Sequence, residues 1–212
     1  GTTEFYGLPF LVDKNTLIPR TETEELIAWV IDEIKVLANN KITELSILDI
    51  GTGTGCIPIS LAKNLTSLNI SAIDISTEAL LIAKQNAILN KVTIEFIELD
   101  ILNAESLPQE YDIIISNPPY VRELEKEEIK NNVLENEPHL ALFVADENPL
   151  IFYNKIADLA KQQLSKNGML FFEINQYLGK ETVNMLVEKG FKNIQLKKDL
   201  FGNDRMIKCV LH

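Results

Sequence analysis

The sequence predicts an α/β domain built on a mostly parallel, doubly wound β-sheet, and three observations lead to this fold class. From residue 46 onward, short apolar runs alternate with segments of helical periodicity, an order typical of βαβ units with helices on both faces of the sheet. The chain has 212 residues, which suits one such domain that buries roughly 70% of its unfolded surface. The last apolar runs flank a Gly202-Asn203 turn, so an antiparallel hairpin should close one edge of the sheet.

The first 20 residues are expected to form a short hairpin, or a pair of edge strands, that leads into a main domain of residues 21–212. Apolar and polar residues alternate in this first segment, as they do in strands with one buried face. Residues 21–40 then repeat apolar positions at helical spacing. Thr21 or Thr23 is expected to cap this helix.

The main domain repeats the strand and helix unit. Buried strands are expected at residues 46–50, 70–75, 92–99, 111–116 and 168–174. Helices should begin near Cys56 and cover residues 76–90 and 148–164. The two strands of the final hairpin are expected at residues 191–199 and 204–212.

The composition argues against several function classes. The net charge is −11, whereas duplex-binding proteins gain most of their non-specific affinity from Lys and Arg, so a nucleic-acid substrate is not expected. No apolar stretch approaches the roughly 20 residues of a membrane span, and no secretory signal is recognisable, so we expect a cytoplasmic protein without a membrane partner. Neither the two cysteines nor the two histidines are spaced as metal ligands, and His139 is expected in a loop.

A glycine-rich turn lies between the first strand of the main domain and its helix. Gly51, Gly53 and Gly55 alternate with Thr52 and Thr54, and such a turn lets a ligand approach the backbone closely. The next residue is Cys56, where a dinucleotide fingerprint would need Gly or Ala, so pyrophosphate binding is disfavoured. Together with the preceding Asp49, this G-x-G-x-G pattern resembles motif I of class I S-adenosylmethionine-dependent methyltransferases, whose ligand carries no phosphate.

Two further acidic residues are expected at the same edge of the sheet. Asp74 ends the second strand, where a carboxylate would accept hydrogen bonds from both ribose hydroxyls of a nucleoside. Asp100 is expected to end the third strand, within reach of an adenine edge. Taken singly, the glycines could merely permit tight turns and the acids could merely cap helices. The combination favours a ligand site at the carboxyl ends of the parallel strands.

The fourth strand runs directly into Asn117-Pro118-Pro119-Tyr120, a rigid, polar and aromatic tetrapeptide. Proline restricts the residue before it to extended conformations, which holds the Asn117 side chain and the Pro118 carbonyl in a fixed relation. Both groups are acceptors, so together they can hold a planar NH₂ group whose nitrogen then receives a methyl group. Tyr120 offers a flat wall for such a group. The structural alternative is a rigid turn with a packed tyrosine.

The motif [N/D]-P-P-[Y/F] at this place is similar to that of amino-methylating enzymes, and three further stretches narrow the resemblance. "EFYGLPFLVDKNTLIPRTETEELI" resembles the segment that leads into the catalytic domain of the peptide chain release factor N5-glutamine methyltransferases, the HemK/PrmC family, in which the sequence L-I-P-R-P-E-T-E occurs. "NEPHLALFVADENPLIFYNKI" and "KDLFGNDRMI" are similar to two later segments of that family. These stretches together cover nearly the whole chain.

The resemblance implies a Rossmann-like class I S-adenosylmethionine-dependent methyltransferase fold and an enzyme that methylates the glutamine of the Gly-Gly-Gln loop in release factors. It implies that S-adenosyl-L-methionine is held by Asp49, Gly51, Thr52, Gly53, Thr54, Gly55, Asp74, Asp100, Ile101 and Asn117. It implies that the glutamine is bound by Asn117, Pro118, Pro119 and Tyr120, with Asn117, Pro118 and Tyr120 acting in catalysis. Arg20 and Glu24 are expected to shape the pocket.

The chain departs from the family pattern at a few positions. Thr21 replaces a proline, and Asn148-Pro149 replaces a glycine region, which affects the expected loop shape more than the chemistry. Ile101 stands where an aromatic residue often covers adenine, so a reduced cofactor affinity is expected. The family also has an N-terminal helical domain of roughly 70 to 90 residues. We expect the present chain to be the catalytic part without that domain.

Three alternatives remain at this point. An N6-adenine methyltransferase acting on DNA or RNA would share Asn117 to Tyr120, although the charge of −11 disfavours a polyanionic substrate. A ribosomal-protein glutamine methyltransferase is barely distinguished by sequence. A nucleoside-binding module without catalysis would be favoured by loss of Asn117 or of a loop glycine, and both are intact.

Overall fold

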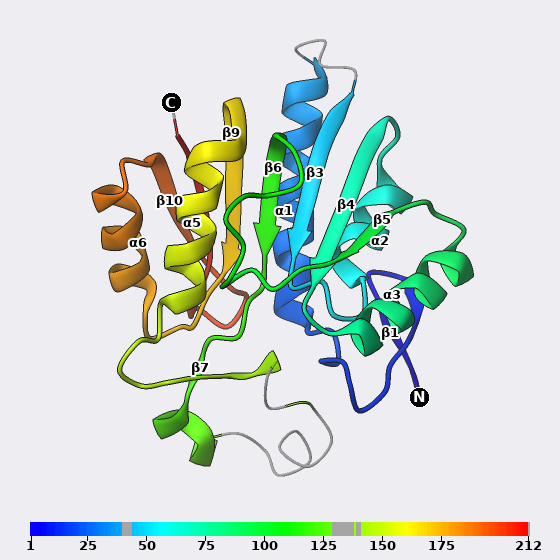
Figure 1. Cartoon of the computed structure of the whole chain (residues 1–212), viewed down its shortest axis with the longest axis horizontal. Helices are drawn as coiled ribbons and strands as arrows, with labels where there is room; N and C mark the ends of the chain where they lie inside the picture. The colour runs from blue at the N-terminus through cyan, green and yellow to red at the C-terminus, as the bar shows by residue number, and fades with distance from the viewer. Residues whose placement is uncertain (40–43, 129–137, 139–140, 212) are drawn as a thin grey trace.

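The central sheet has seven strands in the order β10-β11-β9-β6-β3-β4-β5 in the computed structural model, which describes residues 1–39, 44–128, 138 and 141–211 (Figure 1). The strands are β3 (Leu45–Ile50), β4 (Leu68–Asp74), β5 (Glu95–Glu98), β6 (Tyr111–Ser116), β9 (Leu164–Glu173), β10 (Lys192–Lys198) and β11 (Asp204–Val210). The five strands from β9 to β5 are parallel to one another, whereas β11 pairs antiparallel with both β9 and β10. The predicted parallel sheet with a C-terminal antiparallel hairpin is confirmed.

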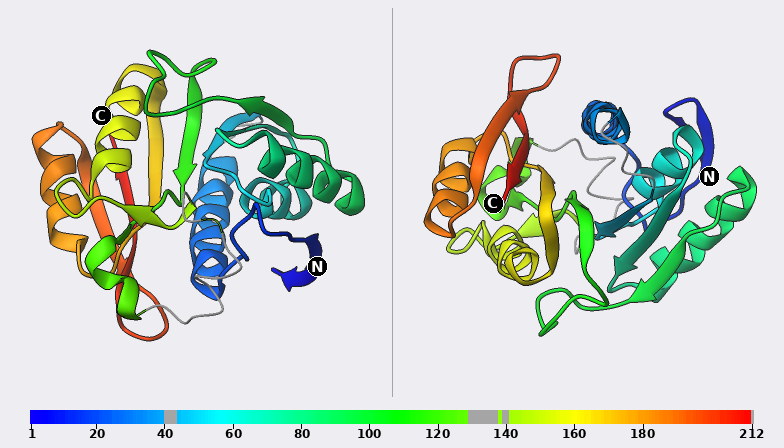
Figure 2. Two further views of the ribbon diagram at one scale, coloured as in Figure 1. Left: turned by 60° about the horizontal axis from the view of Figure 1, so that its bottom comes forward. Right: turned by 90° about the horizontal axis from the view of Figure 1, so that it is seen from above.

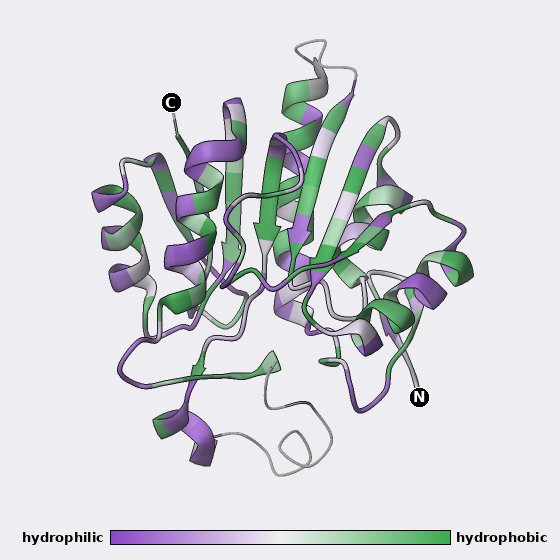
Figure 3. Cartoon of the chain, in the orientation of Figure 1, coloured by the Kyte–Doolittle hydropathy of each residue, from purple (hydrophilic) through white to green (hydrophobic). Residues whose placement is uncertain are grey.

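Helices cover both faces of this sheet (Figure 2). They are α1 (Thr21–Asn39), α2 (Cys56–Asn64), α3 (Thr77–Asn90), α5 (Ile151–Gln163) and α6 (Gly179–Glu188). One apolar cluster lies between the sheet and α5 and α6, and a second lies between the sheet and α1 and α2. Successive isoleucines of β6 alternate between them, because Ile114 belongs to the first cluster and Ile113 and Ile115 to the second. Accordingly, the central strands are mostly hydrophobic, with a few polar positions (Figure 3).

The strand register brings the predicted site segments to one edge of the sheet. Ile50 of β3 pairs with Ser116 of β6 on one side and with Ile73 of β4 on the other. The Ser116 hydroxyl also donates to the Ile50 carbonyl at 2.7 Å, which ties the two strand ends together. The residues that follow these strands are therefore neighbours, and the glycine turn lies between the Asn117 segment and Asp74.

The first residues form the expected hairpin, made of β1 (Thr2–Phe5) and β2 (Leu8–Leu11), and two buried asparagines of α3 fasten it. The Asn86 carboxamide accepts from Leu11 N at 2.7 Å and donates to Leu11 O at 3.0 Å. The same Nδ2 donates to the Thr54 carbonyl of the glycine turn at 2.9 Å. Asn90 donates to Pro9 O at 2.9 Å. Asn86 thus joins the hairpin and the glycine turn.

Several local predictions were wrong. Neither Thr21 nor Thr23 precedes α1 as a cap would, because the helix begins at Thr21, and the Thr23 hydroxyl is buried and bonded to Glu173 of β9. The third strand ends at Glu98, so Asp100 lies two residues beyond it. The last parallel strand begins at Leu164 rather than at residue 168, directly after α5.

Some elements were not foreseen. These are α6, the short parallel strands β7 (Val121–Arg122) and β8 (Phe143–Val144), and the 3₁₀ helix η1 (Glu123–Glu128). His139, which was expected in a loop, lies outside the described residues. The same holds for Asn136, Glu137 and Leu140 of the family-like segment that begins "NEPHLALF". Within the described part of the chain, no helix combines the length and apolarity that a membrane crossing requires.

Candidate functional site

The glycine turn between β3 and α2 is open at two of its glycines and filled at the third. Gly51, Gly53 and Gly55 have φ angles of +75°, +55° and +78°, a region that L side chains rarely adopt. A Cβ atom at Gly51 or Gly53 would have no heavy atom within 4 Å, whereas one at Gly55 would lie 3.0 Å from Ile59 Cδ1. The first two glycines therefore leave space above the turn, and Gly55 permits the close packing of α2 against α3.

This difference predicts different outcomes for two matched substitutions. Gly55→Ala adds a steric clash to a strained φ, so its free energy of unfolding should fall by about 2–4 kcal/mol. Gly53→Ala meets only the strained φ, for which we expect about 1–2 kcal/mol, together with weaker cofactor binding because the methyl group enters the open space. Urea denaturation and calorimetric titration of each variant measure the two effects. A larger loss of stability in Gly53→Ala than in Gly55→Ala would contradict this assignment.

Asp74 organises the glycine turn from the end of β4. Its Oδ2 accepts from Gly53 N at 2.8 Å and its Oδ1 accepts from Ser76 N at 2.9 Å. Burial raises the pKa of Asp74, while the hydrogen bonds from the backbone of Ser76 and Gly53 oppose the rise. Each carboxylate oxygen keeps a second lone pair. Asp74 can therefore hold the turn and still accept from a ligand hydroxyl.

Asp49 is a fully buried acid directly before the turn. Neither carboxylate oxygen has a hydrogen-bond partner among the described residues, and the same holds for the Thr52 hydroxyl. Burial raises the pKa of Asp49 to about 7, and the charge of Asp74 adds to the rise. The nearby Thr52 hydroxyl opposes this rise in pKa, although the Thr52 and Asp49 side chains do not reach hydrogen-bond geometry. A buried carboxyl group without a partner beside an open turn fits a ligand that brings its own donors or positive charge.

Asn117 follows β6 with its amide held on one side. Its Nδ2 donates to Thr23 Oγ1 at 3.3 Å. Among the described residues, no hydrogen bond is donated to Asn117 Oδ1 or to the Pro118 carbonyl. The two acceptors that the sequence assigns to a substrate NH₂ group are thus both unused.

A buried carboxylate on β9 connects α1 with the Asn117 segment. Thr23 Oγ1 donates to Glu173 Oε2 at 2.6 Å, and the Tyr120 hydroxyl donates to Glu173 Oε1 at 3.2 Å. Burial raises the pKa of Glu173, and the Thr23 hydrogen bond and the charge of Arg205 oppose the rise. Burial and the negative charge of Glu173 also raise the pKa of Tyr120, so its hydroxyl stays a donor at neutral pH.

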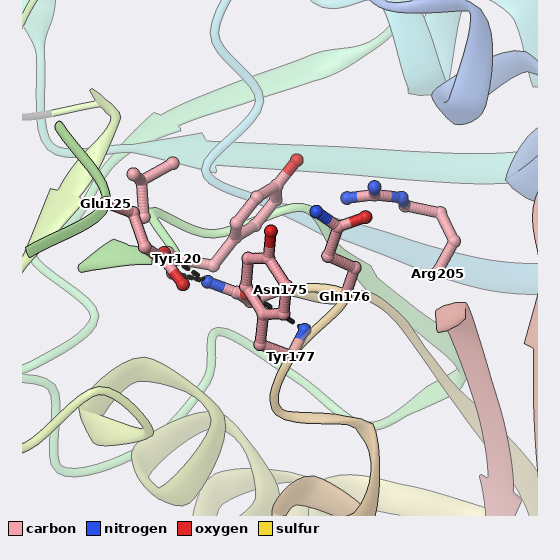
Figure 4. Close-up of a pocket in the computed structure, with 7 residues that line it drawn as sticks. Tyr120, Glu125, Asn175, Gln176, Tyr177 and Arg205 are labelled. Carbon is pink, nitrogen blue, oxygen red and sulfur yellow. Dashed lines mark hydrogen bonds between the residues drawn. The ribbon is translucent and has the colours of Figure 1, made fainter. Parts of the chain in front are cut away.

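A pocket of about 200 Å³ lies against Tyr120 (Figure 4). Its lining residues are Tyr120, Val121, Glu125, Asn175, Gln176, Tyr177 and Arg205. Asn175 Nδ2 donates to the Tyr120 carbonyl at 2.9 Å and to Glu125 Oε2 at 2.7 Å. The backbone of Tyr120 is therefore fixed from the wall of this pocket.

Comparison with known proteins agrees with this arrangement. The Methyltransferase small domain model matches residues 34–142. The release factor glutamine methyltransferase of Flavobacterium psychrophilum is 62% identical over 208 residues, which are 98% of this chain and 72% of that protein. The enzyme of the same name from Bacteroides thetaiotaomicron is 45% identical over the same shares. This chain belongs to the release factor glutamine methyltransferase family.

Solved structures of lower identity share the fold. The N-terminal domain of human METTL16 in complex with SAH superposes with a TM-score of 0.68 at 19% identity, over 98% of this chain and 77% of that one. Ribosomal protein L11 methylase from Lactobacillus delbrueckii superposes with a TM-score of 0.60 at 20% identity, over 91% and 81% of the two chains. The predicted class I methyltransferase fold is thereby confirmed.

Two residues that the family resemblance assigns to the cofactor have other contacts here. Asp100 accepts from Leu102 N at 3.0 Å and from Asn103 Nδ2 at 2.6 Å, so its carboxylate caps a local turn. Ile101 is 8% exposed and packs in the apolar cluster below α5. Their contact with adenine stays a prediction.

Glu24, assigned to pocket shape by the family resemblance, contacts the N-terminal hairpin, because its Oε1 accepts from Tyr6 N at 2.6 Å. The Arg20 carbonyl accepts from Thr23 N at 3.1 Å and so begins α1. Sequence reasoning missed the role of Thr23 and did not mention Glu173. The available signal was one acidic residue near the end of the otherwise apolar run at residues 168–174, where a strand was predicted.

Proposed function

We propose that the chain transfers a methyl group from S-adenosyl-L-methionine to the side-chain amide nitrogen, N5, of the glutamine in the Gly-Gly-Gln loop of peptide chain release factors. Membership of the family supports this substrate, and METTL16 and the magnesium protoporphyrin IX methyltransferase of Synechocystis, which share the fold, have SAH or SAM bound in their structures. The observation that carries the proposal is the pair of unused acceptors, Asn117 Oδ1 and the Pro118 carbonyl, which directly follow β6, the strand next to β3 and its open glycine turn.

The residues of the turn fit this cofactor. Asp49 lacks a donor in the described structure, and the cofactor brings an ammonium group and a sulfonium group that would favour its ionised form. Asp74 retains lone pairs for ribose hydroxyls, and the space above Gly51 and Gly53 admits the ligand without a clash. When bound, the cofactor supplies an electrophilic methyl group.

The Asn117 segment would act on the amide that receives the methyl group. An amide nitrogen is a poor nucleophile because its lone pair is delocalised into the carbonyl group. Asn117 Oδ1 and the Pro118 carbonyl can each accept one N–H of the glutamine, which fixes the nitrogen and favours the developing electron density on it. As the new N–C bond formed, the bond between that carbon and the sulfonium sulfur would break with its electron pair left on sulfur, and the nitrogen would lose one of these two protons to water. Tyr120 limits the space beside the planar amide.

The test incubates the protein with methyl-labelled S-adenosylmethionine and, separately, a release factor, ribosomal proteins, or DNA and RNA. Mass spectrometry then locates the label. We expect one added methyl group on the glutamine of the Gly-Gly-Gln loop, and none on a release factor in which that glutamine is replaced by alanine. Label on nucleic acid alone would favour an adenine methyltransferase. Label on ribosomal protein alone would favour a ribosomal-protein glutamine methyltransferase. Either result overturns the proposal.

A further inference from the structure

The carboxylate of Glu173 is the common partner of two hydroxyl groups, one bonded to Asn117 and the other belonging to Tyr120 of the same segment. Thr23 reaches it from α1 and Tyr120 reaches it from the segment after β6. Thr23 and Glu173 are 2% and 1% exposed, so water does not compete for these hydrogen bonds. Glu173 itself lies on β9, next to β6 in the sheet.

The direction of each hydrogen bond follows from what each group can donate. An ionised carboxylate only accepts, and a threonine hydroxyl has a single hydrogen. The 2.6 Å bond to Glu173 uses that hydrogen, so Thr23 Oγ1 can only accept from Asn117. The Asn117 NH₂ group must then face Thr23. Asn117 Oδ1 therefore points away from Thr23 and can accept a hydrogen bond from the substrate. The Tyr120 hydrogen is directed to Glu173 in the same way.

We propose that Glu173 is a positioning residue for methyl transfer: through Thr23 it sets which end of the Asn117 amide faces the substrate, and it orients Tyr120 directly. This inference rests on the proposed function of Asn117. It assigns a role in the reaction to two residues, Thr23 and Glu173, that are 150 positions apart in the chain.

The surroundings of Glu173 make this role sensitive to protonation. Arg205 favours the charged form, and Glu22 disfavours it. Tyr120 and the buried Cys56, whose pKa burial raises to about 12, stay neutral at neutral pH. Burial raises the pKa of Glu173 above its ordinary value. A protonated Glu173 can donate to Thr23, whose own hydrogen can then turn to Asn117 and reverse the amide.

The first test replaces the charge and keeps the shape with Glu173→Gln. The two hydroxyls bond to different oxygens of Glu173, and in glutamine one of these positions becomes an NH₂ donor, so one of the two hydroxyls loses its acceptor. We expect kcat for the release factor to fall about 10- to 100-fold at saturating S-adenosylmethionine, with the KM for S-adenosylmethionine within about twofold of the unmodified value. The matched control is Glu95→Gln, which alters another hydroxyl and carboxylate pair, Ser71 Oγ to Glu95 Oε2 at 2.9 Å, on β4 and β5.

The second test acts on Thr23 and leaves the carboxylate in place. Thr23→Val removes the hydroxyl and should lower kcat by a similar factor, about 10-fold or more, whereas Thr23→Ser keeps it and should stay within about threefold. If both residues act through one path, their effects should not add. The kcat of the double variant Thr23→Val/Glu173→Gln should then lie within about threefold of the kcat of the slower single variant. If Glu173→Gln fails to fold, the comparison of Thr23→Val with Thr23→Ser, in which Glu173 is unchanged, decides the question.

The pH profile separates positioning from a structural role. The kcat of the unmodified protein should fall as pH drops through the raised pKa of Glu173, and this acid limb should be absent in Glu173→Gln. Unchanged kcat in Glu173→Gln, equal activity of Thr23→Val and Thr23→Ser, or an unchanged acid limb would each overturn the inference. A protein that methylates no release factor would instead overturn the proposed function.

Discussion

Asn117→Ala should lower the rate of methyl transfer by about 100- to 1,000-fold and leave binding of S-adenosylmethionine measurable. The substitution removes one of the two acceptors proposed to hold the glutamine amide, and such preorganised polar groups contribute factors of roughly 10²–10³ each. It also releases Thr23, whose hydroxyl then lacks its donor. The loss therefore falls on the chemical step.

Single-turnover kinetics on a release factor and calorimetric titration with the cofactor measure the two quantities. Asn69→Ala is the matched control, because Asn69 is exposed near the start of β4, at the opposite edge of the sheet, and its Nδ2 donates to Glu44. Its activity should stay within about twofold of the unmodified protein. An Asn117→Ala protein that lost cofactor binding and turnover to the same extent would contradict a role in holding the substrate.

Asp49→Asn should stabilise the protein without ligand at pH 8 and weaken cofactor binding. The folded-state pKa of about 7 lies above the ordinary value of 3.8, so the folded protein binds this proton more tightly than the unfolded chain does. Its contribution to stability is therefore largest at low pH and is lost as pH rises from about 4 to about 7. We expect the substitution to remove this pH dependence and to raise the free energy of unfolding at pH 8 by something on the order of 2–4 kcal/mol.

Cofactor affinity should change in the opposite direction. A cation near Asp49 favours its ionised form, so affinity for S-adenosylmethionine should rise with pH through about 7 in the unmodified protein. Asp49→Asn should bind about 10- to 100-fold more weakly at pH 8, because a charge-assisted contact is worth about 1.5–3 kcal/mol. Denaturation and calorimetric titration at pH 5, 6, 7 and 8 test both trends. Undiminished binding by Asp49→Asn at pH 8 would exclude a direct role.

Local patterns in the sequence were sufficient to predict the position of the glycine turn and of the rigid segment after β6. A glycine at φ +55° and two consecutive prolines constrain the backbone through their own chemistry, so their effect is visible without a fold. The parallel order of the strands then places both at one edge. The position of Asp74 was predicted correctly for the same reason, since it ends a strand of clear apolar pattern.

Contacts between distant segments were beyond such patterns. Thr23 looked like a helix cap, because capping depends on neighbours in sequence, while its actual partner, Glu173, comes from a strand 150 positions away. Asp100 was placed at a strand end because the apolar run continues to Leu99, although pairing with β4 stops at Glu98. Helix α6 begins without a side-chain cap at Gly179, so it lacks the usual starting signal.

The three hydrogen bonds of the Asn86 side chain connect the N-terminal hairpin, β1 and β2, to the glycine turn of the proposed cofactor site. The Asn86 carboxamide makes all three hydrogen bonds only while Leu11 and the Thr54 carbonyl are both in place. Separation of the hairpin from α3 would leave the buried Asn86 amide without its Leu11 partners. It would also weaken the restraint on the glycine turn at Thr54, which lies more than forty positions after Leu11 in the chain. A displacement of β1 and β2 should therefore change the conformation of the glycine turn, where the methyl donor is expected to bind.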